Sequence, residues 1–141
     1  MSNATNTDVK FRFLNFAVKE SHIVLNQQGE FKINVDLNPK GFVFKALNQF
    51  HLEFDVEIKE ESNKFHIKVI GIGIFEFDPN TNIEQYKSNY FTINAPAIVF
   101  PYIRAYISNL TTQSGLFTVT LPTFNLSGLA EALKSNITEL E

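Results

Sequence analysis

The amino-acid sequence predicts an α+β protein, with strands in the first half of the chain and helices in the second. Between residues 10 and 77, apolar and polar residues alternate in runs separated by turn-forming residues, as in strands. From residue 96 onward, apolar residues recur at the spacing of helices. Strands followed by helices are typical of an α+β fold. The length of 141 residues predicts one domain at residues 10–141, after a flexible polar tail at residues 1–9.

The first two predicted strands differ in how regular their alternation is. Residues 10–23 change parity part-way, from Phe11 and Phe13 to a second set: Leu14, Phe16 and Val18. This pattern predicts a strand that contains a bulge or that is covered on both faces. After a turn signal at residues 26–29, regular alternation over residues 31–37 predicts a half-buried strand, which ends at the turn signal of residues 38–41.

The third and fourth predicted strands form the clearest hairpin in the sequence. Residues 50–59 place apolar side chains on one face and polar side chains on the other, and residues 65–77 extend the apolar face. A two-residue turn at residues 62–63 would set Val56 opposite Val69. A shift by one residue would place buried positions against solvent positions, so the register is well specified.

The fourth strand becomes apolar on both faces in its second half. Ile70, Ile72 and Ile74 follow polar residues on the outward parity. Because outward isoleucines are not expected on a solvated sheet face, we expect another surface to cover them. Gly71 and Gly73 interrupt the inward row, which predicts a bend or the close approach of another backbone.

The second half of the chain predicts a long helix and a shorter one. Residues 96–113 form the long helix, with Pro96 in its first turn and Pro101 as a kink or a break. Its apolar residues cover more than the stripe of about 100° that a surface helix needs, so we expect the sheet and a partner to bury it from two sides. An irregular apolar segment follows at residues 116–126, and residues 127–140 predict a final amphipathic helix.

The composition excludes several classes of protein. A net charge of −3 with no basic run argues against nucleic-acid binding. The absence of cysteine excludes a disulfide scaffold, a catalytic thiol and Cys-ligated zinc. No apolar stretch approaches the roughly 18 residues that span a bilayer, and the first residues lack the apolar segment of a signal peptide. We therefore expect a cytoplasmic chain without membrane insertion.

The residues that most often carry chemistry form no convincing site. The histidines lack the spacing of a metal site: His22, His51 and His66. Alternate acidic residues on the third strand are typical of a solvated face or a docking patch rather than of catalysis: Glu53, Asp55 and Glu57. Because no nucleophile and base are paired by any motif, we expect neither an enzyme nor a bound cofactor or metal.

Several short motifs, taken together in their order, resemble a known family. They are FPYIR at residues 100–104, IS at 107–108, GLF at 115–117 and LPTFNL at 121–126. This series resembles the SecB family of export chaperones, whose signature is an FPYAR-type helix, an IS pair, a GxF turn and an L-x-P-x-NF entry to the last helix. The strands at residues 10–23 and 64–77 are similar to those of the family, and the resemblance covers residues 10–139.

The resemblance implies both a fold and an activity. The implied fold is a four-stranded antiparallel sheet packed on a long helix, followed by a shorter C-terminal helix. The implied activity is ATP-independent binding of unfolded preproteins in apolar grooves by a homotetramer, a dimer of dimers, with handover to the SecA motor. We expect the oligomer interface to include Ile70, Ile72, Ile74, Tyr102, Arg104, Tyr106 and Ile107. We expect a motor-docking surface, if present, to include Glu20, Glu53, Asp55 and Glu57.

A client-binding groove is expected where apolar residues crowd short segments. One wall would be formed by Phe117, Val119, Leu121 and Phe124, and the opposite wall by Phe42 and Phe44. Roughly half of residues 116–126 are expected to line the core beneath the last helix instead. A chaperone that holds many sequences needs adaptable apolar surface and exposed strand edges rather than a shaped polar pocket.

Departures from the family pattern leave the partner open. The connection at residues 26–30 is shorter than the usual crossover loop of the family. Glu20 matches one acidic docking position, whereas Val24, His66 and Lys68 stand where acidic or apolar docking residues are expected. A chaperone dedicated to the antitoxin of a toxin–antitoxin system is therefore an alternative. A carrier that encloses a small apolar ligand among its aromatic residues is a third hypothesis.

Overall fold

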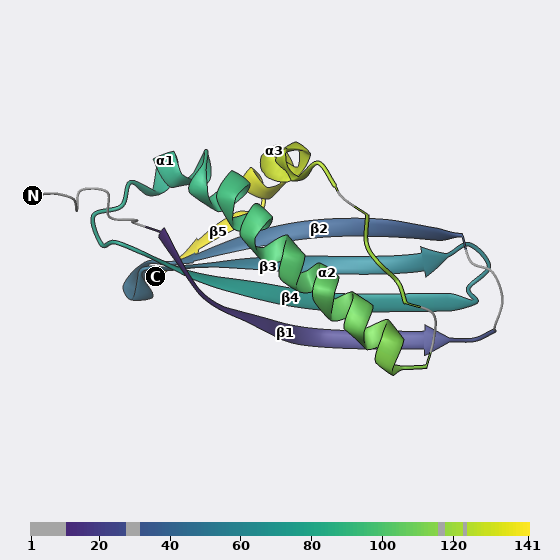
Figure 1. The fold of residues 1–141 in the computed structure, drawn as a ribbon. Helices are drawn as coiled ribbons and strands as arrows, with labels where there is room; N and C mark the ends of the chain where they lie inside the picture. Colours follow the sequence, from purple (N-terminus) through teal and green to yellow (C-terminus); the bar gives the residue numbers. More distant parts are fainter. Residues whose placement is uncertain (1–10, 28–31, 116–117, 123) are drawn as a thin grey trace, which may run out of the picture.

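The computed structural model describes residues 11–27, 32–115, 118–122 and 124–141, and shows a five-stranded sheet with helices packed on one face (Figure 1). The order of strands across the sheet is β1-β4-β3-β2-β5. Four of them pair with one another in antiparallel fashion: β1 (Phe11–Leu25), β2 (Ile33–Phe44), β3 (Gln49–Glu60) and β4 (Phe65–Phe77). The last strand, β5 (Ile137–Leu140), pairs in parallel with β2.

The helices follow β4 and cover a single face of the sheet. They are α1 (Ile83–Lys87), the π-helical turn η3 (Tyr90–Asn94), α2 (Ala95–Gln113), the 3-10 turn η4 (Leu126–Leu129) and α3 (Ala130–Lys134), and a further 3-10 turn, η2 (Lys45–Leu47), joins β2 to β3. Helix α2 crosses the sheet obliquely (Figure 1). We call the face beneath α2 the inner face and the opposite one the outer face. The predicted α+β class is thereby confirmed.

Two bulges explain the change of parity along β1. The pairing of β1 with β4 shifts between Phe13 and Asn15, and again between Val18 and Glu20. Each extra residue reverses which parity faces inward. The inner face of β1 therefore remains mostly apolar along its whole length, through Phe11, Phe13, Phe16, Val18, Ile23 and Leu25. The predicted bulge is confirmed.

The predicted end of the second strand at residues 38–41 is wrong. Strand β2 continues through these residues to Phe44, because each of them stays paired with β3, from Asn38 opposite Asp55 to Phe44 opposite Gln49. Pairing with a neighbouring strand thus outweighs the local turn signal.

The hairpin of β3 and β4 has the predicted register. Val56 lies opposite Val69, and Glu57 lies opposite Lys68. In the turn, Asn63 adopts a φ of 60°, and its backbone N–H donates to the carbonyl oxygen of Glu60 at 3.0 Å. Asparagine tolerates this left-handed conformation better than most residues, which suits it to the turn.

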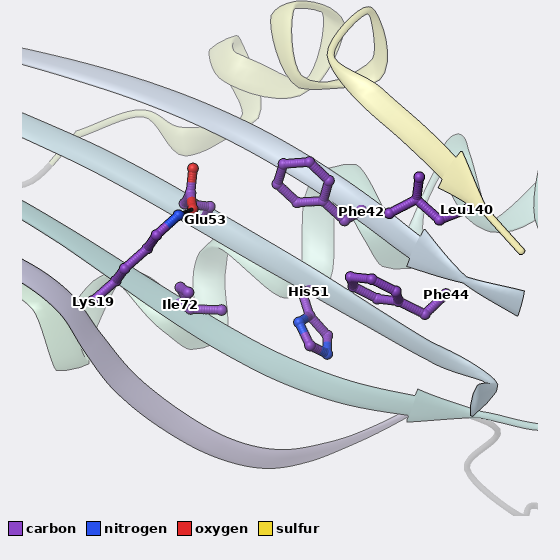
Figure 2. Close-up of a pocket in the computed structure, with 7 residues that line it drawn as sticks. All are labelled: Lys19, Phe42, Phe44, His51, Glu53, Ile72 and Leu140. Atoms are coloured by element: carbon purple, nitrogen blue, oxygen red, sulfur yellow. Dashed lines mark hydrogen bonds and ion pairs between the residues drawn. The ribbon is translucent and has the colours of Figure 1, made fainter. Parts of the chain in front are cut away.

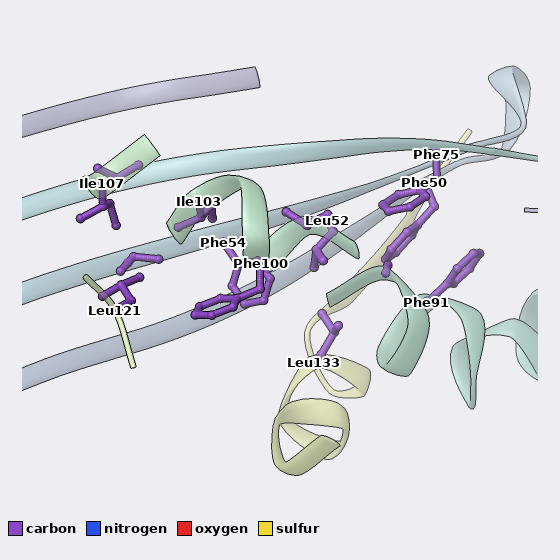
Figure 3. Close-up of a cluster of buried hydrophobic side chains, with 14 of the residues drawn as sticks. Phe50, Leu52, Phe54, Phe75, Phe91, Phe100, Ile103, Ile107, Leu121 and Leu133 are labelled. Atoms are coloured by element: carbon purple, nitrogen blue, oxygen red, sulfur yellow. The ribbon is translucent and has the colours of Figure 1, made fainter. Parts of the chain in front are cut away.

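The core lies between the inner face and α2 (Figure 3). Strand β3 contributes every second side chain, and all of these are fully buried: Phe50, Leu52, Phe54, Val56 and Ile58. The rings of Phe50 and Phe91 stack with centroids 4.1 Å apart, and Phe54 meets the edge of Phe100 at 6.4 Å. Aromatic side chains thus fill much of the space between the sheet and the helix.

Two glycines of β4 allow α2 to approach the sheet. A Cβ atom at Gly73 would lie 2.2 Å from Cγ2 of Val99, and one at Gly71 would lie 3.0 Å from the Ile103 side chain. Both distances are shorter than a van der Waals contact between carbon atoms. The predicted close approach occurs at these glycines, although its partners are helical side chains rather than another backbone.

Helix α2 runs without interruption through Pro101, so the predicted break does not occur there. Proline at an interior position lacks one backbone donor and crowds the carbonyl four residues earlier. Pro101 projects from the exposed side of α2, whereas Val99, Phe100 and Ile103 hold the helix to the sheet. This packing compensates for the local cost of the proline.

The C-terminal region corrects two predictions. Residues 127–140 do not form one helix, because α3 ends at Lys134 and β5 follows. The sheet consequently has five strands rather than four, and one of its pairings is parallel. The spacing of Leu129, Leu133 and Ile137 fits a helix, but pairing with the edge of β2 takes over from Ile137 onward.

The segment after α2 is held by one buried hydroxyl group, which leads to a stability prediction. Thr111 Oγ1 accepts a hydrogen bond from the Val119 amide at 2.9 Å. Thr111→Val leaves this buried donor unpaired, so we expect the free energy of unfolding to fall by about 1–3 kcal/mol. Chemical denaturation would measure the loss. Thr120→Val, at an exposed threonine of the same segment, is the control and should change stability by less than about 0.5 kcal/mol.

Candidate functional site

The sheet separates the two predicted walls of the groove. Phe42 and Phe44 project from the outer face, since Phe42 pairs with His51 on the polar side of β3. Val119 and Leu121 are 3% and 0% exposed, and they pack in the core on the inner face. The described residues of the two walls therefore do not line a common surface.

Two of the predicted groove residues remain, Phe124 and Phe117. Phe124 is half-buried and meets the edge of Phe100, with ring centroids 5.6 Å apart. Phe117 lies outside the described residues. Of the five predicted groove residues that the structure describes, only Phe42 and Phe44 line a pocket on the outer face.

The outer-face pocket, as we name it, lies where β2, β3 and β4 run side by side (Figure 2). It has a volume of about 300 Å³ and is lined by Lys19, Phe42, Phe44, His51, Glu53, Ile72 and Leu140. Phe42 and Leu140 form one side of it, and the ring of Phe44 lies against His51 with centroids 4.5 Å apart. The pocket thus offers apolar and aromatic walls to a partner.

Polar groups border this pocket without filling it. Lys19 Nζ lies 3.1 Å from Glu53 Oε1, and His51 Nε2 lies 2.9 Å from Gln49 Oε1. Burial of the imidazole lowers the pKa of His51, which favours its neutral form near neutral pH. The pocket is therefore apolar inside, with an ion pair at its rim. It suits a side chain or small group that carries no net charge.

The sequence did not single out three of the pocket residues. Lys19 reaches the pocket because the second bulge of β1 places it there, and Leu140 lies in a strand where a helix was predicted. His51 was predicted on a solvated face, with no role assigned. Because His51 alternates with the buried residues of β3, the sequence did place it on the outer face. No nearby residues in the sequence showed that Phe42 and Phe44 would lie beside His51.

The predicted interface isoleucines and docking acids share the outer face. Ile70, Ile72 and Ile74 are half-buried there, in register with polar residues of β3. Each acidic residue has a cationic or imidazole group within 4 Å: Glu20 with His22, Glu53 with Lys19, Asp55 with Lys68, and Glu57 with His66 and Lys59. The hydrogen bond from His66 lowers the pKa of Glu57. Charge on this face is therefore largely paired.

The predicted interface residues of α2 lie on the opposite side of the sheet and differ among themselves. Tyr102 is 46% exposed and stacks on Phe16, whereas Ile107 is fully buried in the core of its own chain. The hydroxyl of Tyr106 lies 3.0 Å from Ser21 Oγ, and Arg104 is half-buried. The exposed apolar stripe of α2 consists of Ile98, Pro101, Tyr102 and Ala105.

Comparison with known proteins decides the family. A family model described as "Preprotein translocase subunit SecB" matches residues 9–135. The chain belongs to the SecB family. The resemblance seen in the sequence motifs is thus confirmed, and the SecB region covers the sheet from β1 to β4 together with α1, α2 and α3.

Named relatives of this SecB-family chain match it over different lengths. A protein-export protein SecB of Orientia tsutsugamushi is 36% identical over 72 residues, which cover 48% of this chain and 43% of that protein. The match thus spans less than half the length of that relative. An uncharacterized protein of Methanocaldococcus jannaschii is 29% identical over 152 aligned residues, covering 91% of this chain and 89% of that protein.

A solved structure shares the fold. The SecB-like chaperone of Mycobacterium tuberculosis, in complex with a ChAD peptide from the HigA1 antitoxin, superposes with a TM-score of 0.68 at 12% identity. The match covers 82% of this chain and 88% of that one. A likeness at this identity shows that the SecB-like fold is common to both chains.

Two further properties concern the described part of the chain. No group of His, Asp and Glu side chains there is arranged to hold a metal ion. None of the helices described there combines the length and the apolar character that crossing a bilayer requires.

Proposed function

We propose that this chain is an ATP-independent chaperone that holds unfolded polypeptides before their export through the Sec pathway. Membership of the SecB family over residues 9–135 carries this proposal. The outer-face pocket supports it, because a binder of many sequences needs adaptable apolar surface rather than a shaped polar site.

Client contact is proposed at the outer-face pocket, around Phe42, Phe44 and Ile72. A client side chain that becomes well buried there would gain roughly 1.5–3 kcal/mol. Part of this gain is lost in ordering the client chain. A few such contacts would reach micromolar affinity, which corresponds to about −8 kcal/mol.

Assembly and handover are further parts of the proposal. A homotetramer would bury the exposed stripe of α2 around Tyr102 or the outward isoleucines of β4, both of which are apolar surfaces that monomers seldom leave in water. A motor such as SecA would dock on the outer face through Glu20, Glu53, Asp55 and Glu57. Because these carboxylates are already paired, we expect such docking to depend weakly on salt.

The experiment that tests client binding removes both aromatic side chains of the outer-face pocket. For the double variant Phe42→Ser with Phe44→Ser, we expect at least about tenfold weaker binding of an unfolded, aromatic-rich polypeptide, equivalent to about 1.4 kcal/mol. Isothermal calorimetry would measure the affinity, and circular dichroism would confirm that the fold is retained. Leu47→Ser is the matched control, because Leu47 is 60% exposed and does not line the pocket. Unchanged affinity in a folded double variant would place the client site elsewhere.

A chaperone with one dedicated client is the second candidate. The observation that favours it is the shared fold with a SecB-like chaperone that is bound to an antitoxin peptide. The two candidates differ in selectivity, which a competition assay would measure. If the chain is a general export chaperone, unrelated unfolded polypeptides should displace one another from it. A protein that binds one polypeptide tightly and ignores the others would favour the dedicated role.

A further inference from the structure

The feature that carries a further inference is β5, the short strand that ends the chain. It lies wholly beyond residues 9–135, which match the SecB family model. It pairs in parallel with the last third of β2, setting Gly41 beside Ile137 and Phe44 beside Leu140. The amide of Gly41 donates to the Asn136 carbonyl oxygen at 3.1 Å. Strand β5 is thus a short extended segment on the edge of the sheet formed by β2.

The place that β5 occupies is a favourable stretch of this edge for pairing. The amide of Gly41 points toward β5, so the nitrogen of Pro39, two residues earlier, points toward the same edge. Proline has no N–H to donate, and it therefore interrupts the row of donors. From Gly41 to Phe44 the edge is free of proline, and it borders the outer-face pocket. A segment paired here gains backbone hydrogen bonds together with an apolar contact.

The side-chain anchors of β5 are few. Ile137 is half-buried beside Gly41, while Thr138, Glu139 and Leu140 are exposed. Glu139 forms ion pairs with Lys87 of α1 and, at 3.1 Å, with Lys45 of η2. These pairs lower the pKa of Glu139 and raise that of Lys87. Lys45 is exposed, whereas the side chains of Lys87 and Glu139 are 16% and 29% exposed, so the pair with Lys87 holds β5 more firmly than a surface ion pair would. No side chain of β5 is fully buried, and a client strand on the same edge would replace the backbone hydrogen bonds of β5.

We propose that β5 is a built-in competitor, occupying the edge of β2 on which an extended client segment pairs and leaving it when a client binds. Leu140 contacts the outer-face pocket as an apolar client side chain would (Figure 2). An added strand gains affinity from its main-chain hydrogen bonds and selectivity from alternate side chains. The inference rests on the proposed client binding, and it adds that the unliganded chain partly blocks its own site.

Charge reversal at the ion pairs of β5 tests the competitor. Glu139→Lys sets like charges beside Lys45 and Lys87, and we expect it to bind a labelled synthetic peptide of about ten alternating apolar and polar residues about fivefold more tightly. Fluorescence anisotropy would measure the affinity. Glu84→Lys is the matched control, because Glu84 also pairs with Lys87 but lies in α1 and is 79% exposed. Its affinity should equal that of the unmodified chain. The gain should vanish for the same peptide N-methylated at alternate amides, which cannot pair with a strand.

A disulfide bond that fixes β5 to the edge of β2 also tests the inference, and it should weaken peptide binding rather than strengthen it. The chain has no cysteine, so Lys40→Cys with Asn136→Cys introduces a single pair, at positions that continue the register of Gly41 and Ile137. The oxidised form should bind the peptide at least about tenfold more weakly than the reduced form of the same protein. If circular dichroism shows that Glu139→Lys is unfolded, the comparison of the oxidised and reduced double-cysteine protein tests the inference by itself.

The possible failures point to different conclusions. If the unmodified chain binds the peptide, but neither charge reversal nor oxidation changes the affinity, β5 is not a competitor and the proposed client binding stands. If no form of the chain binds the peptide or an unfolded protein, the proposed function fails and the competitor fails with it.

Discussion

Replacing Gly73 by alanine should destabilise the fold by about 1–3 kcal/mol, because its Cβ atom would overlap a buried methyl group of α2. The new atom would lie 2.2 Å from Cγ2 of Val99, whose side chain is fully buried and stiff at χ1. Helix α2 or strand β4 must then shift. The free energy of unfolding from urea denaturation would measure the loss.

Two controls show whether the effect of Gly73→Ala comes from this contact. Gly128→Ala adds a methyl group where no atom lies within 4 Å, so its stability should change little. Combining Gly73→Ala with Val99→Ala removes the overlapping methyl groups, and the double variant should recover part of the stability lost through Gly73→Ala beyond additivity. Strict additivity of the two changes would contradict close packing between β4 and α2.

Placing a charge on the exposed stripe of α2 should dissociate the proposed oligomer. Ala105 is exposed beside Pro101 and Tyr102, and its replacement by Asp removes no core packing from the chain itself. An unpaired carboxylate in a dry interface costs several kcal/mol, on the order of 3–5, and this is enough to shift a micromolar assembly toward smaller species. Light scattering at micromolar concentration would report the mass.

Ala132→Asp provides the matched control for the interface, since it makes the same replacement at an exposed alanine of α3. Its mass should equal that of the unmodified chain. Ile107→Asp would be uninformative here, because Ile107 is fully buried within its own chain and its charge would unfold the protein. An unmodified chain that scatters as a 16.1 kDa monomer would contradict the oligomer and favour the carrier hypothesis.

Local patterns predicted the elements whose partners lie close in the sequence. The hairpin of β3 and β4 has the expected register because its turn and its alternating residues are contiguous. The bulged β1 and the helix at residues 95–113 were likewise visible as changes of period. The motifs at residues 100–126 indicated the SecB family, which the family match confirms.

The end of the chain shows where local spacing misleads. Leu129, Leu133 and Ile137 are spaced as in a helix, yet Ile137 belongs to a strand. The choice depends on the edge of β2, which lies almost a hundred positions earlier in the sequence and offers Gly41 as a hydrogen-bond donor. Hydrogen bonding to a distant edge outweighed a weak helical preference, and no window around Ile137 contains that information.

The sequence by itself determined which side of β3 is buried, the register of the central hairpin and membership of the SecB family. Only the tertiary structure decided that Phe42 and Phe44 lie on the opposite side of the sheet from Val119 and Leu121, and that Lys19 and Leu140 complete their pocket. The physical reason is that alternation along a strand fixes only which of its own side chains share a face. The face on which a later segment packs depends instead on where α2 crosses the sheet.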